Sequence, residues 1–262
     1  MIPKIIHYVW IGGNPLPPLA ERCLASWKEH MPAWQFMRWD ETNFDIPSAP
    51  LYVRQAYDAR KYAFVSDYIR LWALEQYGGL YMDVDFMVFR PFDDLMDKYS
   101  AFAGYEGSKR QSVMQGVIAS EPHGAWVRDM LSTYDDRSFI KTDGCLDLTP
   151  NTAYFTDRLE SQGFVADGVE KDFFLNDGMS RADALNEPHS LNDGRIFMLH
   201  VYPVHYFCPV LTTGEDVRNF ETYCEHKGES SWAQQTLKGR LMSMLSPKWK
   251  TRIIKLKRKI LG

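Results

Sequence analysis

The sequence lacks the features that mark secreted, membrane-spanning and nucleic-acid-binding proteins. Only 4 cysteines occur among 262 residues, without Cys-x-x-Cys spacing, so we interpret them as reduced thiols of a cytosolic protein. The apolar run in MIPKIIHYVWIGG is short and has no small-residue cleavage site, so we expect no secretory signal there. No stretch reaches the ~18 apolar residues that cross a bilayer. The net charge of −4 argues against a nucleic-acid partner.

The charge is unevenly distributed, because residues 238–262 contain nine Lys or Arg and no Asp or Glu. Apolar side chains recur there at helical spacing, at Trp249, Ile253, Leu256 and Ile260. A cationic amphipathic helix of this kind binds the surface of an anionic membrane. A solvated charged tail and an oligomerisation helix are the alternatives. We therefore divide the chain into a globular part, 1–236, and a basic tail, 237–262.

The order of the expected elements predicts an α/β fold. The apolar run Lys4–Ile11 is typical of a buried strand, Pro17–His30 of a helix and Trp34–Trp39 of a second strand, which together suggest a βαβ unit. We expect a Rossmann-like, mostly parallel sheet flanked by helices. A helical region is predicted at 54–77, with a break near Tyr62 and an end at Gly78-Gly79. A strand at 80–89, a strand pair at 100–120, a helix at 122–134 and a strand-like segment at 195–209 are expected to follow.

The most informative motif is Asp83-Val84-Asp85, inside GGLYMDVDF. If the strand continues through it, the alternation places Tyr81, Asp83 and Asp85 on one face. Two neighbouring carboxylates at an apolar strand end are costly to bury unless a cation neutralises them. A hard divalent ion that binds together with a diphosphate meets this need. The alternative is a carboxylate pair that faces water or caps a helix.

A second motif lies in the preceding helical region, where Asp67 and Arg70 stand three residues apart beside Ser66. Such a pair can be a simple ion pair on a helix surface. The surrounding residues are apolar, however, so the helix is expected to be largely buried. In that case Asp67 can accept hydrogen bonds from sugar hydroxyls while Arg70 orients it.

Two further segments contain candidate site residues, on weaker grounds. Trp10 ends the first predicted strand, where ligands bind in open parallel sheets, and is either a stacking platform for a base or a core residue. His226, Ser231 and Trp232 lie in the polar segment HKGESSW, where nothing local makes the histidine a ligand.

Taken together, three segments resemble the DXD-containing glycosyltransferases of family 32, the capsular-polysaccharide and initiating-mannosyltransferase type. These segments are IPKIIHYVWIGG, YAFVSDYIRLWALEQYGGLYMDVDF and TYCEHKGESSW. The similarity extends from residue 2 to about residue 232, and it extends distantly to the catalytic domain of the large clostridial glucosylating toxins.

The resemblance implies a GT-A fold, a nucleotide-sugar donor and Mn²⁺ or Mg²⁺. It implies a role for each matching residue. Trp10 stacks on the base, and Ser66, Asp67 and Arg70 hold the ribose and the donor sugar. Tyr81 and Asp83 contact ribose, sugar or metal-bound water, Asp85 is the direct metal ligand and Gln115 lies near the sugar. His226, Ser231 and Trp232 close over the diphosphate and complete the metal shell. The family often has His-His-Trp before Ser-Trp. Here Lys227 and Gly228 follow His226, so Lys227 is an alternative partner for the β-phosphate.

The implied activity is metal-dependent transfer of a hexose, with retention of anomeric configuration, from a donor that is expected to be UDP-linked. With the basic tail on a membrane, the expected acceptor is a saccharide attached to lipid, and the expected role is surface-polysaccharide synthesis. The expected location is the cytoplasmic face of a bacterial inner membrane. Two alternatives stay open: a membrane-docked protein that binds sugar nucleotides without catalysis, and an aspartate-dependent phosphotransferase.

Overall fold

The computed structural model describes residues 1–107, 111–176 and 195–228 of the chain. The compact unit that carries the sheet spans Met1–Lys227. Ser231, Trp232, the boundary at 236/237 and the basic tail 238–262 lie outside the described residues, so the predictions about them stay predictions. Among the described helices, none is long and apolar enough to cross a membrane.

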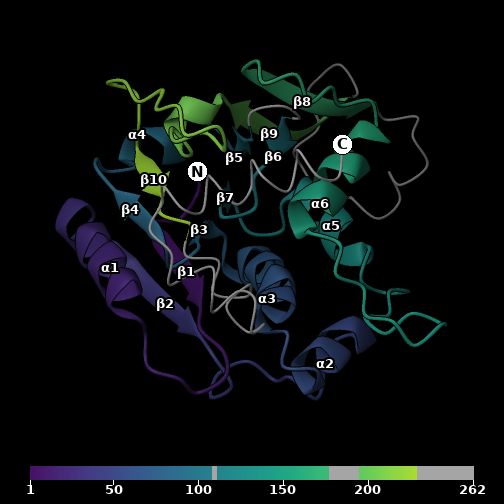
Figure 1. The fold of residues 1–262 in the computed structure, drawn as a ribbon. Coiled ribbons are helices and arrows are strands. Elements are labelled where there is room, and N and C mark those ends of the chain that lie inside the picture. The colour runs from purple at the N-terminus through teal and green to yellow at the C-terminus, as the bar shows by residue number, and fades with distance from the viewer. Residues whose placement is uncertain (108–110, 177–194, 229–262) are drawn as a thin grey trace, which may run out of the picture. The chain divides into compact units, whose positions relative to one another are not determined.

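The chain begins with a strand, a helix and a second strand, which are followed by two helices and a third strand (Figure 1). In chain order the elements are β1 Ile5–Val9, α1 Pro18–His30, β2 Gln35–Trp39, α2 Leu51–Asp58, α3 Tyr62–Tyr77, β3 Gly79–Met82, β4 Phe86–Val88, α4 Asp93–Met96, β5 Ala101–Glu106, β6 Ser112–Val113, β7 Val117–Ser120, α5 Ala125–Ser132, α6 Asn151–Glu160, β8 Lys171–Asn176, β9 Arg195–Tyr202, the short 3₁₀ helix Val204–Tyr206 and β10 Cys224–His226.

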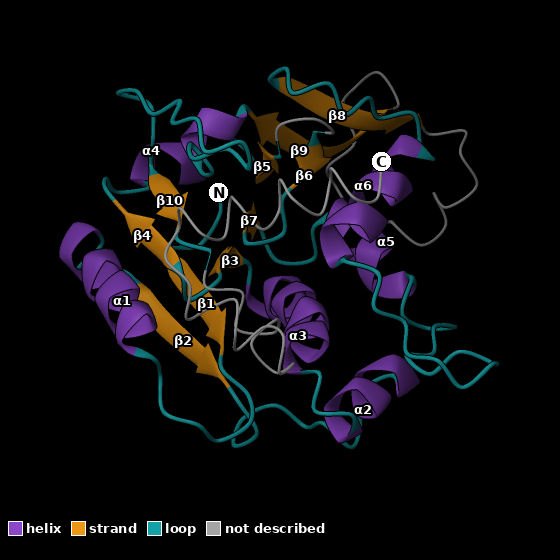
Figure 2. Cartoon of the chain, in the orientation of Figure 1, coloured by secondary structure: helices purple, strands orange, loops and turns teal. Residues whose placement is uncertain are grey.

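The main sheet has the strand order β2-β1-β3-β7-β5-β9-β8, with β6 paired to β5 (Figure 2). Pairs β1–β2, β1–β3 and β5–β9 are parallel, whereas β7 is antiparallel to both of its neighbours and β8 is antiparallel to β9. Strands β2, β1, β3, β5 and β9 therefore run in the same direction. The predicted α/β class, a mostly parallel sheet flanked by helices, is confirmed.

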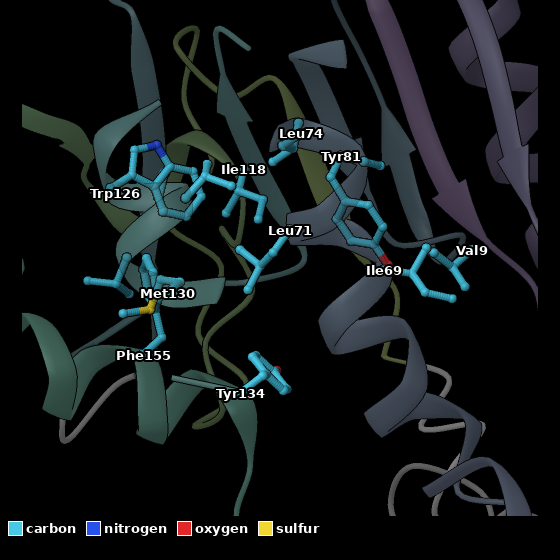
Figure 3. Packing of buried hydrophobic residues seen from close by; sticks show 14 of the residues in the cluster. Val9, Ile69, Leu71, Leu74, Tyr81, Ile118, Trp126, Met130, Tyr134 and Phe155 are labelled. Atoms are coloured by element: carbon cyan, nitrogen blue, oxygen red, sulfur yellow. The ribbon is translucent and has the colours of Figure 1, made fainter. Parts of the chain in front are cut away.

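Both faces of the sheet are covered by apolar side chains. Figure 1 shows α1 on one side of strands β2, β1 and β3 and α3 on the other. One buried cluster contains Leu80 and Met82 together with Trp27 of α1. The other contains Tyr81 of β3 together with Ile69 of α3 (Figure 3). Alternate residues of β3 thus enter opposite cores, which explains why this strand is apolar at nearly every position.

The connection from α3 to β3 depends on Gly78 and Gly79. Both residues have positive φ, 62° and 111°, and a Cβ atom on Gly79 would lie 2.6 Å from the carbonyl oxygen of Ile5. The buried side chain of His7 bridges this connection, since its Nε2 donates to the carbonyl of Gly78 (2.8 Å) and its Nδ1 accepts from the indole of Trp39 (3.1 Å). The helix therefore passes directly into the central strand.

One predicted element is wrong in detail, because 80–89 is not a single strand. Strand β3 ends at Met82, residues 83–85 form a turn, and β4 begins at Phe86. Strand β4 lies in a separate two-stranded sheet with β10. The predicted alternation therefore stops at Met82, and Asp83 and Asp85 lie on a turn at the carboxyl end of β3.

The buried imidazole of His7 should make the stability of the protein sensitive to acid. Burial lowers the pKa of His7 to about 4, from 6.5 for an exposed histidine. The unfolded chain therefore binds the proton first, and stability is lost as the pH falls from 6.5 towards 4. We expect protonation of this residue to lower the free energy of unfolding by about 2 kcal/mol between pH 7 and pH 4.5. The measurement is urea denaturation at several pH values.

The variant His7→Gln provides the control, since its side chain does not titrate. It is expected to be less stable at pH 7, because one amide cannot replace both ring contacts. Its free energy of unfolding should nevertheless fall less steeply with acid than that of the wild type. Parallel pH profiles for the two proteins would contradict the assignment.

Candidate active site at the end of strand β3

The turn Asp83–Asp85 is fixed by contacts from three other parts of the chain. The N–H of Asp83 donates to the carbonyl of Gly116 (2.8 Å). The indole of Trp27 in α1 donates to the carbonyl of Phe86 (2.7 Å). The N–H of Lys227, just after β10, donates to the carbonyl of Asp85 (2.9 Å). The backbone that presents the two carboxylates is thus held in one position by distant segments.

A buried guanidinium, that of Arg70 in α3, connects the helix to this turn. Its Nη2 lies 2.8 Å from Asp67 Oδ1 and 3.5 Å from Asp83 Oδ1. The Nη1 donates to the carbonyl of Gln115 (2.7 Å), and the Nε and Nη2 donate to the carbonyl and Oγ of Ser66. The predicted pair of Asp67 and Arg70 is therefore buried and part of the same site as Asp83.

The Asp83 carboxylate is oriented by a second residue of β3. The hydroxyl of Tyr81 donates to Asp83 Oδ1 (2.5 Å), and the guanidinium carbon of Arg70 lies 4.6 Å from the centre of the Tyr81 ring. Burial raises the pKa of Asp83, while Arg70 and the Tyr81 hydrogen bond lower it. Burial also raises the pKa of Asp67 to about 6, against the attraction of Arg70. One cation thus serves two carboxyl groups, of which Asp67 is the less exposed (14% against 34% for Asp83).

The second carboxylate, Asp85, faces a histidine 141 residues away in the chain. The Nε2 of His226 lies 3.1 Å from Asp85 Oδ2, and its ring stacks on Phe86, with centroids 4.7 Å apart. Burial acts to lower the pKa of His226, but the contact with Asp85 and the charges of nearby carboxylates raise it. The implied nearness of His226 to the Asp-x-Asp motif is seen in the structure. The side chain of the next residue, Lys227, donates a hydrogen bond from its Nζ to Glu225 Oε2 (2.6 Å).

The remaining predicted residues lie near this edge or outside the described part. Trp10 directly follows β1, which pairs in parallel with β3, and its indole donates to the carbonyl of Asn14 (2.7 Å). Ser66 donates to the carbonyl of Ala63. Gln115 is buried. Contacts of these residues with a ligand, and those of Ser231 and Trp232, stay predictions.

Two residues of the site were missed in the sequence. Gly116 lies against the turn so closely that a Cβ atom there would be 3.0 Å from Asp83 Oδ2 and 2.7 Å from Phe86. Glu106 ends β5, and its charge interacts with those of His226, Asp83 and Arg70. A possible signal for Glu106 was an acidic residue that closes the apolar segment AFAGYE.

The side chains fit a cation that binds together with a phosphate-bearing substrate. No group of three or more His, Cys, Asp or Glu among the described residues is arranged to hold a metal, so a closed site built of protein ligands alone is not found there. Magnesium-like ions need only one or two protein carboxylates, since phosphate oxygens and water complete their shell. Asp85, with Asp83 and His226 beside it, offers a donor set of that kind.

The region around this turn matches a known protein family. Residues 17–102 match the family described as "Glycosyltransferase sugar-binding region containing DXD motif". The matched segment contains Ser66, Asp67, Arg70, Tyr81, Asp83 and Asp85; Trp10, Gln115 and His226 lie outside it.

Two fungal proteins are similar to parts of the chain. Glucan organizing enzyme 1 of Cryptococcus neoformans var. grubii is 26% identical over 169 residues, which are 52% of this chain and 44% of that protein. Inositol phosphoceramide mannosyltransferase 1 of Schizosaccharomyces pombe is 30% identical over 107 residues, which are 37% of this chain and 32% of that protein. The chain thus matches less than half the length of each of these relatives.

Solved structures with partial similarity include two glycosyltransferases. The PaToxG glycosyltransferase has a TM-score of 0.45 and 17% identity, covering 61% of this chain and 69% of that one. The galactosyltransferase LgtC, solved with donor and acceptor sugar analogs, has a TM-score of 0.31 and 16% identity, covering 50% and 65%.

The central place of Arg70 predicts a large loss of stability when its charge is removed. In Arg70→Met, the carboxylate of Asp67, whose side chain is 14% exposed, loses its cation, and the half-buried carboxylate of Asp83 loses one of its partners. We expect the free energy of unfolding in urea to fall by about 3–5 kcal/mol.

The matched control is Arg90→Met, because Arg90 also pairs with a carboxylate, Asp94, but its side chain is 38% exposed. Water screens that pair, so the expected loss is about 1 kcal/mol or less. Equal losses for the two variants would mean that Arg70 does not neutralise the buried carboxyl groups.

Proposed function

We propose that the protein is a metal-dependent glycosyltransferase of the family-32 type with a GT-A fold. In this proposal it transfers a hexose, with retention of anomeric configuration, from a UDP-linked donor to a saccharide acceptor. The observation that carries the proposal is the fixed turn at the end of β3. There Asp83 is oriented by Tyr81 and Arg70, Asp85 faces His226, and the whole turn lies within the matched sugar-binding region.

The roles of the residues in this proposal follow from charge and position. Asp85, with Asp83 and His226 beside it, would hold a divalent cation, which would supply positive charge to stabilise the diphosphate leaving group. Arg70 holds Asp83 and Asp67 in fixed positions, so that their free oxygens can accept hydrogen bonds from hydroxyl groups of the ribose and sugar. Trp10 offers an indole face to the base at the adjacent strand end.

Removing the Asp85 carboxylate should abolish the reaction while leaving the fold intact. We expect the wild type to release nucleotide from one member of a panel of UDP- and GDP-sugars in the presence of Mn²⁺, and to be inactive in EDTA. In Asp85→Asn the release should fall by at least about 100-fold, as when a transition-state contact is lost. The measurement is a coupled assay of free nucleoside diphosphate.

Asp58→Asn is the control, because Asp58 is an exposed carboxylate at the end of α2. Its activity should equal that of the wild type. Donor binding by calorimetry without any release, with or without acceptor sugars, would favour the non-catalytic alternative. Nucleotide release that persists in EDTA and in Asp85→Asn would contradict the proposal.

We further propose that the basic tail 238–262 attaches the protein to the cytoplasmic face of a membrane, close to a lipid-linked saccharide acceptor in surface-polysaccharide synthesis. The support is its sequence, with nine basic residues and apolar residues at helical spacing. Each basic residue near an anionic surface adds roughly 1 kcal/mol to binding.

Deleting residues 238–262 should therefore abolish sedimentation with vesicles that contain anionic phospholipid. Vesicles of phosphatidylcholine alone serve as the control and should bind neither protein. The double variant Ile253→Ser/Leu256→Ser keeps every basic residue and should bind anionic vesicles more weakly than the wild type, because it lacks the apolar stripe. Unchanged binding after the deletion would exclude this attachment.

A further inference from the structure

Glu106 lies at the same edge of the sheet as the candidate site. It is the last residue of β5, which runs in the same direction as β1 and β3. The carboxyl ends of these three strands carry Glu106, Trp10 and Asp83, respectively. Ligands of open α/β sheets bind outside the carboxyl ends of the strands. The position of Glu106 in the fold is therefore a position for substrate contact.

Strand β5, which Glu106 ends, and strand β3, which leads into Asp83, flank the same strand, β7. The charge of Glu106 interacts with those of His226, Asp83 and Arg70. Burial raises the pKa of the Cys208 thiol, and the negative charges of Glu106 and Asp83 add to this rise. Burial raises the pKa of Glu106, and a hydrogen bond from Thr152 in α6 opposes that rise. A carboxylate partly removed from water, beside a hydroxyl-binding site, gains from a further donor.

The segment between β6 and β7 contains a buried acceptor that has no hydrogen-bond partner among the described residues. Gln115 is only 2% exposed, and its Oε1 is buried with no hydrogen-bond partner among the described residues. The backbone carbonyl of the same residue accepts from Arg70. A buried acceptor without a donor is costly, because it has lost its hydrogen bonds to water. A ligand that carries hydroxyl groups would remove this cost.

We propose that Glu106 is a substrate-contacting residue that accepts a hydrogen bond from a saccharide hydroxyl beside Asp83. This inference rests on the proposed function and extends its saccharide-binding part to β5. The hydroxyl belongs either to the transferred sugar or to the acceptor, because both present the same donor group. The competing explanation is that Glu106 only ties the end of β5 to Thr152.

The test compares Glu106→Gln with the wild type and with Glu29→Gln, which changes an exposed carboxylate of α1. Three quantities are measured for each full-length protein: the Kd for UDP with Mn²⁺, nucleotide release from UDP-sugars without acceptor, and release with a panel of mono- and oligosaccharides. For Glu106→Gln we expect an unchanged Kd for UDP and a loss of about 10- to 100-fold in kcat/KM, the size of a hydrogen bond to a charged group. Glu29→Gln should match the wild type.

The pattern of loss identifies the source of the hydroxyl. A loss with and without acceptor places it on the transferred sugar, and a loss only with acceptor places it on the acceptor; both support the proposal. A kcat/KM of Glu106→Gln within twofold of the wild-type value, with and without acceptor, overturns the proposal. A weaker Kd for UDP together with a lowered Tm also overturns it, in favour of the structural explanation. Failure of the wild type itself to bind UDP or to release nucleotide overturns the proposed function, and this inference with it.

Discussion

The candidate site depends on one buried cation. The guanidinium of Arg70 reaches from α3 to two carboxylates, Asp67 and Asp83, and to the backbone before β7. Without it, the carboxylates of Asp67 and Asp83 would lie close together with no cation between them, which is a costly arrangement for groups partly removed from water. With it, the end of β3, the helix that precedes it and the neighbouring chain segment are held in one geometry. Because arginine stays charged at any working pH, this frame does not change as the site binds or loses protons.

The two aspartates of the motif lie in different surroundings. Asp83 has one oxygen engaged by Tyr81 and close to Arg70, so it is oriented within the protein. Asp85 lies two residues further on, after the chain has turned out of the sheet, and its neighbour is the imidazole of His226. A single turn therefore gives two identical carboxylates different surroundings. This difference is the physical basis for assigning saccharide contact to the first and cation binding to the second.

Local patterns in the sequence predict the elements and the central motifs. Contacts between segments that are distant in the chain cannot be predicted from such patterns and come from the structure alone. The βαβ start, the helix break near Tyr62 and the stop at Gly78-Gly79 follow from short-range rules, and all are found. The break after Met82 was missed because Val84, Phe86 and Val88 continue the apolar alternation. The turn forms there because Gly116 and Trp27 bind its backbone. Glu106 was missed for the same reason, since strand direction, not local composition, brings it to the site.

The pairing of β4 with β10 places Phe86 opposite His226 and closes a loop of 140 residues along the chain. A contact of such long range orders a long loop of chain, and this loss of entropy comes before the contact stabilises the fold. Such contacts therefore form late in folding. During synthesis, the segment that carries Asp83 and Asp85 leaves the ribosome well before residue 226 does. The site therefore becomes complete only when nearly all of the folded unit has been made, and a truncated chain that ends before β10 cannot assemble it.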